Sequence, residues 1–297
     1  MAADIVARPP GAIAERRRRL FLVGMTLPGA LATLVLVLFA LAVVVLLGLR
    51  TNDGSLLGGA FTLDNLSNAL LDPLYAAVLL RSLGIAALVT IATVVTAYPV
   101  AYYLAFHAGR WRGLLLFLVT LPFWTSYLLR VFAWKIVLAF NGVLNSALLG
   151  TGLTSEPILA FLNTPAAVVV TLAHAYAAFA ILPIYVALET IPRSLLEAAS
   201  DLGAPPFATF RKVVLPISMP GVLAAALVVF VPTVGDYVTP ALVGGPSSTM
   251  IGSIIQAQFG KANDWPFGAA LSLLVMLVII AVVLVVRLAD RRFGSRT

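Results

Sequence analysis

Six long apolar runs alternate with short polar segments along this chain. Each run is long enough for the roughly 20 residues that a helix needs to cross a bilayer's hydrocarbon core. Five of the runs contain no charged residue, and the third continues past Arg130 and Lys135. The pattern predicts an all-α membrane protein with six transmembrane helices, in Leu20–Leu49, Ser82–Phe106, Gly113–Phe140, Pro157–Leu188, Val213–Gly235 and Trp265–Val286.

Composition agrees with a membrane protein. Of the 297 residues, 61% are hydrophobic and 10% are charged, whereas a soluble domain is about half apolar and about a quarter charged. The chain has no cysteine, which excludes disulfides and thiolate ligands. His107 and His174 are too few and too far apart to indicate a metal site, and no cofactor is expected.

Positive charge is concentrated in alternate polar segments. With the N-terminus inside, 14 of the 19 Lys and Arg residues lie on the cytoplasmic side, which is the side that basic loops favour. Both termini are therefore predicted to be cytoplasmic, and the net charge of +7 reflects orientation rather than nucleic-acid binding. We expect a basic tail at 1–19, a first helix at 20–49, a helical core at 76–288 and a second tail at 289–297.

The twin arginines of Arg18–Leu22 are similar to those of an export signal. The apolar run that follows is about twice as long as the apolar core of a signal peptide. We therefore expect the first helix to remain as a membrane anchor.

A short polar stretch, Leu195–Pro216 (LLEAASDLGAPPFATFRKVVLP), separates the fourth and fifth runs. Ser194 and Glu197 have the spacing of a capping box at a helix start. Gly203 fits the left-handed residue that ends a helix, and Pro205–Pro206 prevent its continuation. So short a helix is marginal without packing, so we expect another protein to cover it on the cytoplasmic side. A merely well-capped loop is the alternative.

The same stretch resembles the EAA loop of ABC importer permeases. Glu197-Ala198-Ala199 is followed after three residues by Gly203, and after nine more by Val213 and Leu215-Pro216. The family often has Ile where this chain has Val213. In that family the loop, here at about 190–216, forms a coupling helix that lies in a groove of the ATPase. The resemblance assigns coupling to Glu197, Ala198, Ala199, Asp201, Leu202 and Gly203.

The resemblance extends to the spermidine/putrescine permease subunits and covers most of the chain. It implies a type I ABC importer permease (MetI-like) fold in a bacterial inner membrane. The implied partners are a second permease, two copies of an ATP-binding subunit and a periplasmic substrate-binding protein, with a small polyamine-like cation as substrate. The similar stretches are FTLDN (61–65), LDPLY (71–75), PFWTSYLLR (122–130), LLEAASDLGA (195–204), LPISMPG (215–221), PTVGDYV (232–238) and DWPFGAA (264–270).

The residues alone leave other transport functions open. The chain lacks a phosphate-binding P-loop, since Gly260-Lys261 is followed by Ala262 and has no glycine cradle before it. ATP hydrolysis is therefore expected on another subunit, and the chain itself is not expected to be an enzyme. The same architecture could import an opine, an amino acid or an organic anion. A secondary carrier is less favoured because no inverted repeat is evident.

One acidic residue ends the fifth apolar run. Asp236 in VPTVGDYVTP is predicted near the outer face, where it could receive a cationic substrate. A structural ion pair with Arg130 or Lys135 is the alternative interpretation. Tyr237 lies beside it as a further pathway candidate.

Two aromatic residues precede Arg130 in the third run. Trp124 and Tyr127 are three residues apart, which would place them on one helical face. Aromatic faces attract amines, although such pairs also serve helix packing. We expect His174 to be a hydrogen-bonded residue inside the bundle.

Overall fold

The structure is a computed structural model that describes residues 11–54 and 59–294. Its regular elements in these ranges are helices, apart from one β-bridge between Arg50 and Phe61. The long helices are α1 (Gly11–Gly48), α3 (Pro73–Phe106), α7 (Pro165–Glu189), α10 (Leu215–Val234) and α13 (Trp265–Gly294). The short α-helices are α2 (Asp64–Leu71), α4 (Arg112–Thr120), α5 (Tyr127–Val137), α6 (Val143–Gly150), α8 (Arg193–Asp201), α9 (Pro206–Thr209), α11 (Val238–Val243) and α12 (Ile251–Ala257). Single turns of 3₁₀-helix occur at Gly109–Trp111 (η1), Leu121–Trp124 (η2) and Pro246–Ser248 (η4), and of π-helix at Phe210–Val214 (η3) and Gln258–Ala262 (η5).

Five helices in the described ranges are long and apolar enough to span a membrane, and a sixth span is broken. The sixth consists of Gly109–Trp124 and Tyr127–Val137, which meet at an angle of 89°. The prediction of an all-α protein with several apolar spans is confirmed: the described ranges contain five such helices, or six spans if the bent pair is counted as one. The expectation that the third run forms one continuous helix is wrong, because Thr125 and Ser126 adopt extended backbone (ψ 149° and 137°).

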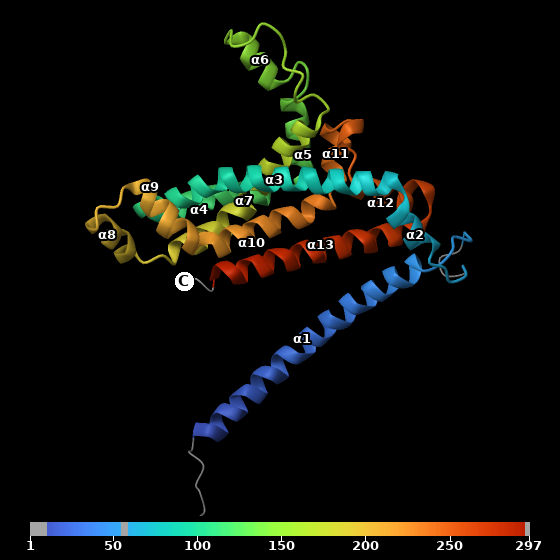
Figure 1. Ribbon diagram of the computed structural model, residues 1–297, viewed down its shortest axis with the longest axis horizontal. Coiled ribbons are helices and arrows are strands. Elements are labelled where there is room, and N and C mark those ends of the chain that lie inside the picture. Colours follow the sequence, from blue (N-terminus) through green and yellow to red (C-terminus); the bar gives the residue numbers. More distant parts are fainter. Residues whose placement is uncertain (1–10, 55–58, 295–297) are drawn as a thin grey trace, which may run out of the picture.

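The bundle has two distinct ends (Figure 1). Helices α3, α7, α10 and α13 lie side by side, with α8 and α9 at one end and α2 and α12 at the other. The start of α1 and the end of α13 point toward the α8 end, while α1 diverges from the bundle. Following the predicted orientation, we name the α8 end the inner end and the opposite end the outer end.

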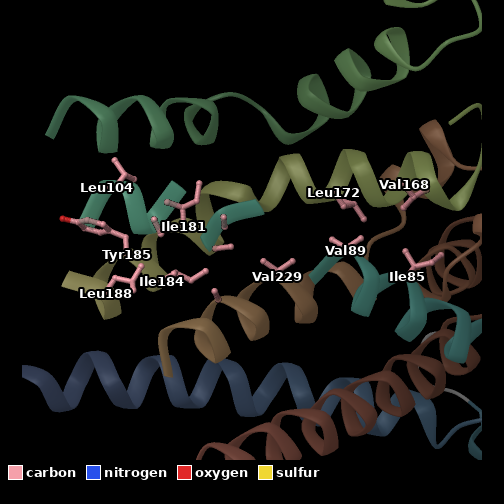
Figure 2. Packing of buried hydrophobic residues seen from close by; sticks show 14 of the residues in the cluster. Ile85, Val89, Leu104, Val168, Leu172, Ile181, Ile184, Tyr185, Leu188 and Val229 are labelled. Carbon is pink, nitrogen blue, oxygen red and sulfur yellow. The ribbon is translucent and has the colours of Figure 1, made fainter. Parts of the chain in front are cut away.

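The core is formed mainly where α3, α7 and α10 pack together. Ile85 and Val89 lie beside Val168 and Leu172 toward one end, and Val229 of α10 faces the same core (Figure 2). All five side chains are buried. Small residues allow close approach in such bundles, and a Cβ on Gly221 of α10 would collide with Ala187 and with the Pro183 carbonyl oxygen, 2.7 Å away, on α7.

Proline and aspartate set the outer ends of two spans. Asp72 precedes α3, and its carboxylate accepts a hydrogen bond from the Leu74 N–H at 2.8 Å, with Pro73 as the first helical residue. Asp264 acts similarly before α13, where it accepts from the Phe267 N–H at 3.2 Å. These carboxylates satisfy N–H groups that a helix start leaves without partners.

Helix α1 stands largely alone. It begins at Gly11, inside the segment expected to be a tail, and its side chains from Gly24 to Ala42 are exposed. Among the side-chain positions of α1 that the structure describes, close packing occurs at its end, where a Cβ on Gly48 would lie 3.1 Å from Leu273 of α13. A helix that is apolar on all sides belongs in lipid or against another membrane helix.

Candidate functional site

Helix α8 starts differently from the sequence-based prediction. It begins at Arg193, so Ser194 is its second residue, and no side-chain capping hydrogen bond forms at its start. Pro192, with φ −62° and ψ 132°, occupies the N-cap position instead. The predicted capping box is therefore wrong, because the extended proline starts the helix too early for the Ser194 hydroxyl to act as the cap.

The end of α8 is as predicted. Gly203 has φ +73°, in the left-handed region that favours glycine. The Gly203 N–H donates to the Ser200 carbonyl at 2.8 Å, and the Ala204 N–H donates to the Ala199 carbonyl at 3.0 Å. This pair of bonds is a Schellman motif, which gives the last carbonyls of α8 their partners.

One side of α8 is attached to the bundle and the other is open. Ile191, just before the helix, is buried in the core, and Leu196 packs against it. Leu202 is 88% exposed, and Phe207 in the next helix is 73% exposed. Exposed apolar residues among polar ones mark surfaces for protein contact. Of the residues assigned to coupling, Ala199 is half-buried, and the exposed ones are Glu197, Ala198, Asp201, Leu202 and Gly203.

An ion pair joins the end of α7, shortly before α8, to the broken span. Arg112, the first residue of α4, pairs with Glu189, the last residue of α7. The Arg112 guanidinium also lies 5.0 Å from the ring centroid of Tyr185. The sequence analysis did not identify this contact, although a single acid at the inner end of the fourth run was a visible signal. The pair therefore joins the start of α4 to the end of α7, four residues before α8 begins.

A second polar cluster surrounds Asp236 beyond the outer end of α10. The Asp236 carboxylate is buried, with 8% of the residue exposed. Its Oδ2 accepts a hydrogen bond from the Tyr127 hydroxyl at 2.7 Å, and its Oδ1 accepts from the Val238 N–H at 3.0 Å. The Tyr127 hydroxyl also lies 2.6 Å from the Thr239 hydroxyl.

The basic residues of α5 do not neutralise Asp236. No ion pair within 4 Å involves Asp236 in the part of the chain that the structure describes. Arg130 instead donates to the Ala175 carbonyl of α7 at 2.7 Å. The alternative of a structural ion pair with Arg130 or Lys135 is therefore wrong for this conformation. The physical reason is that α5 turns Arg130 toward α7, and only Tyr127 toward Asp236.

Trp124 and Tyr127 do not share a helical face. The break at Thr125 separates them, so Trp124 ends η2 and is 79% exposed, while Tyr127 starts α5 and is partly buried. The prediction of one aromatic face is wrong. Tyr237 is 46% exposed beside Asp236, and His174 packs its ring 5.4 Å from the Trp134 ring.

Two aromatic side chains of α7 extend the cluster that contains Tyr127 and Asp236. The Tyr176 ring lies 6.5 Å from the Tyr127 ring, and Phe179 lies 6.0 Å from Tyr176 and 4.7 Å from Phe123. The sequence analysis did not select Tyr176 or Phe179, whose three-residue spacing in an apolar run resembles ordinary packing. No cluster of His, Cys, Asp and Glu suited to a metal ion occurs within residues 11–54 and 59–294.

Comparisons with known proteins agree on the class of protein. Residues 97–295 match the family described as binding-protein-dependent transport system inner membrane component. The spermidine/putrescine transport system permease protein PotB of Escherichia coli is 41% identical over 248 residues, covering 84% of this chain and 90% of that protein. PotB of Haemophilus influenzae is 41% identical over 224 residues, covering 75% and 78%.

Solved structures give the same fold. A chain of a bacterial ABC transporter that imports the acidic polysaccharide alginate matches with a TM-score of 0.70 and 16% identity, covering 95% of this chain and 98% of that one. A chain of the MetNI methionine ABC transporter matches with a TM-score of 0.53 and 21% identity, covering 77% and 100%. These likenesses show the fold of a type I ABC importer permease.

This chain belongs to the family of binding-protein-dependent transport system inner membrane components, among the polyamine permeases of ABC importers. It is a multi-pass protein of the bacterial inner membrane. Its relatives are transport permeases rather than enzymes.

Proposed function

We propose that this chain forms one half of a membrane pathway for polyamine uptake, driven by ATP hydrolysis on a separate subunit. The observation that carries the proposal is the buried, hydrogen-bonded Asp236 carboxylate, which lies beyond the outer end of α10 without a cationic partner within 4 Å among the described residues. Relatives at 41% identity are named for spermidine and putrescine transport, and both compounds are cationic amines.

The chemistry of the Asp236 cluster suits an ammonium group. A carboxylate at membrane depth is costly unless charge or hydrogen bonds compensate it. Tyr127 and the Val238 N–H supply two hydrogen bonds, and each carboxylate oxygen retains a further lone pair for a donor. The rings of Tyr127 and Tyr176 add faces that attract cations. Asp236 would supply charge, and the aromatic residues would orient the amine, with Trp124 and Tyr237 as exposed contacts nearer the solvent or a partner.

The exposed face of α8 would receive the ATP-binding subunit. Leu202 and Phe207 provide the apolar contact, and Glu197 and Asp201 surround it with charge. The Schellman motif at Gly203 would hold the helix end rigid while force is applied. The Arg112–Glu189 pair would pass the movement to α4. A periplasmic substrate-binding protein would deliver the amine at the outer end.

Uptake by the assembled transporter tests the proposed substrate. The complete importer, with receptor and ATPase, is reconstituted in vesicles, and uptake of labelled spermidine is measured against putrescine and a neutral analogue as competitors. Asp236→Asn is expected to reduce uptake at least tenfold, because the neutral amide cannot pair with an ammonium group. Asp64→Asn, an exposed acid in α2, is the control and should leave uptake unchanged. Normal uptake by the Asp236→Asn transporter would contradict the assignment.

A further inference from the structure

The chain beyond the fifth span folds back onto its own start. After Asp236, helix α11 lies beside α5, and α12 lies at the outer end of the bundle (Figure 1). Gly252, the second residue of α12, lies against the backbone of Gly235 and Asp236. We call residues 235–252 the return loop. Asp236, the proposed cation ligand, therefore lies at the root of a loop whose two ends touch.

The contact between the two ends of the return loop requires glycine at position 252. A Cβ on Gly252, which is buried, would collide with the Gly235 carbonyl oxygen and would lie 3.1 Å from the Asp236 carbonyl oxygen. Glycine is the residue that permits so close an approach of two backbones. Both neighbouring atoms belong to the main chain, so no flexible side chain can move aside to make room. The backbone of α12 therefore limits where the turn that carries Asp236 can lie.

A serine of α3 holds the start of α12 in this position. The first N–H groups of a helix have no partner inside the helix, and here the Ile251 N–H donates to the Ser82 hydroxyl at 2.7 Å. The Ser82 hydroxyl in turn donates to the Val78 carbonyl at 2.8 Å. Ser82 and Ile251 are both fully buried. Because a buried N–H needs a hydrogen-bond partner, this bond joins α12 firmly to α3.

Asp236 is therefore held through its main chain as well as through its side chain. Tyr127 of α5 fixes the carboxylate, and its hydroxyl also reaches Thr239 of the return loop. Helix α12, held by α3, fixes the backbone behind the carboxylate. Binding groups that rigid elements support keep their geometry more precisely than groups on free loops. The bonds of an ammonium group to a carboxylate are short, at about 2.7–2.9 Å, so a displacement of about 1 Å would break them.

We propose that Gly252 and Ser82 are positioning residues of the cation site, which together set how far the Asp236 carboxylate reaches toward the amine. This inference rests on the proposed function, in which Asp236 pairs with an ammonium group. Neither residue needs to touch the substrate, since each acts through the backbone that carries the carboxylate. A change at either position should therefore impair capture of the amine while the ATP-binding subunit continues to hydrolyse ATP.

The amount of spermidine carried per ATP hydrolysed tests the positioning role. Both rates are measured in vesicles that contain the complete importer, supplied with receptor, spermidine and ATP. Gly252→Ala is expected to lower the ratio at least fivefold, whereas poorer folding alone would lower both rates in proportion. Gly84→Ala is the control, because a Cβ there meets no atom within 4 Å, and should keep the ratio. An unchanged ratio for Gly252→Ala, with both rates normal or both reduced, would overturn the inference.

Two variants of Ser82 provide a second measurement if Gly252→Ala fails to assemble. Threonine and valine have the same shape, but only threonine keeps the hydroxyl that accepts from the Ile251 N–H. Ser82→Val is expected to lower the spermidine carried per ATP at least threefold relative to Ser82→Thr, and equal ratios would contradict the role of Ser82. Asp236→Asn in the same vesicles separates the two proposals. Normal uptake by Asp236→Asn means that the proposed function fails, whereas reduced uptake with unchanged ratios at positions 252 and 82 means that only the positioning role fails.

Discussion

The hydroxyl of Tyr127 donates a hydrogen bond of 2.7 Å to the carboxylate of Asp236, although 109 residues separate them in the chain. Tyr127 is the first residue after the break in the third crossing, and Asp236 follows the end of α10 in the fifth. The bond therefore joins the broken third span to the outer end of the fifth, at the place where the proposed cation site lies. Any movement of Tyr127 at the start of α5 changes a hydrogen bond of the carboxylate.

Removing this bond should weaken both the fold and transport. Tyr127→Phe leaves a buried carboxylate oxygen and the Thr239 hydroxyl each short of a partner, at a cost of about 1–3 kcal/mol. We expect a lower thermal unfolding midpoint for the purified importer and slower spermidine uptake. Tyr103→Phe in α3 is the matched control, because the Tyr103 side chain is 54% exposed and lies away from Asp236, and it should behave like the unmodified protein. Equal midpoints for the two variants would show that the bond contributes nothing.

The ion pair of Arg112 with Glu189 should matter more for coupling than for stability. Both side chains are more than a third exposed, so solvent screens their attraction. Arg112→Ala and Glu189→Ala are each expected to reduce spermidine uptake severalfold, with little change in the unfolding midpoint. The exchanged pair Arg112→Glu with Glu189→Arg should restore part of the loss. A double-mutant cycle with strictly additive effects would rule out the proposed link.

Two substitutions of Gly203, the residue that ends α8, are expected to differ in severity. A Cβ on Gly203 has no neighbour within 4 Å, so Gly203→Ala is penalised only by its left-handed backbone, at about 1–2 kcal/mol. Gly203→Pro cannot adopt φ +73° and removes the N–H that bonds Ser200. ATP-dependent uptake should be reduced modestly in the alanine variant and lost in the proline variant, with both still inserted in the membrane. Full uptake by the proline variant would exclude a role for this helix end.

The close contact between α7 and α10 predicts that alanine substitution affects the stability of the protein differently at two glycine positions. Gly221→Ala places a Cβ against Ala187 and the Pro183 carbonyl, and such overpacking costs typically 1–3 kcal/mol. Gly84→Ala in α3 meets no atom within 4 Å and gains helix propensity. Thermal unfolding of the two variants should shift in opposite directions relative to the unmodified protein. An unchanged unfolding temperature for the Gly221→Ala variant would mean that α7 and α10 can move apart at no cost in free energy.

The apolar runs predicted the crossings because lipid requires continuous hydrophobicity, and Gly203 predicted the end of α8 because glycine readily adopts the left-handed backbone found there. The bend after Trp124 was not predictable in the same way. A straight and a bent helix bury similar apolar residues, so hydrophobicity does not distinguish them, and Pro122 alone does not specify an angle. The capping prediction at Ser194 failed because Pro192 starts α8 earlier.

The hydrogen-bond partners of Asp236 could not be predicted from the sequence either. Its position near the end of an apolar run was visible, but the choice between Tyr127 and Arg130 depends on how α5 is rotated about its axis. That rotation follows from the packing of Val131 and Trp134 against the core. Contacts between residues 109 positions apart require the fold to be known.

Dependence on a separate ATPase is the central claim, and uptake of labelled spermidine into reconstituted vesicles tests it most directly. The complete importer with ATP is compared with the same importer lacking its ATP-binding subunit, and with one carrying Glu197→Lys in α8. We predict uptake only with the complete, unmodified importer, while Glu197→Lys inserts normally but does not transport. Spermidine accumulation by this chain without the ATP-binding subunit would contradict the account.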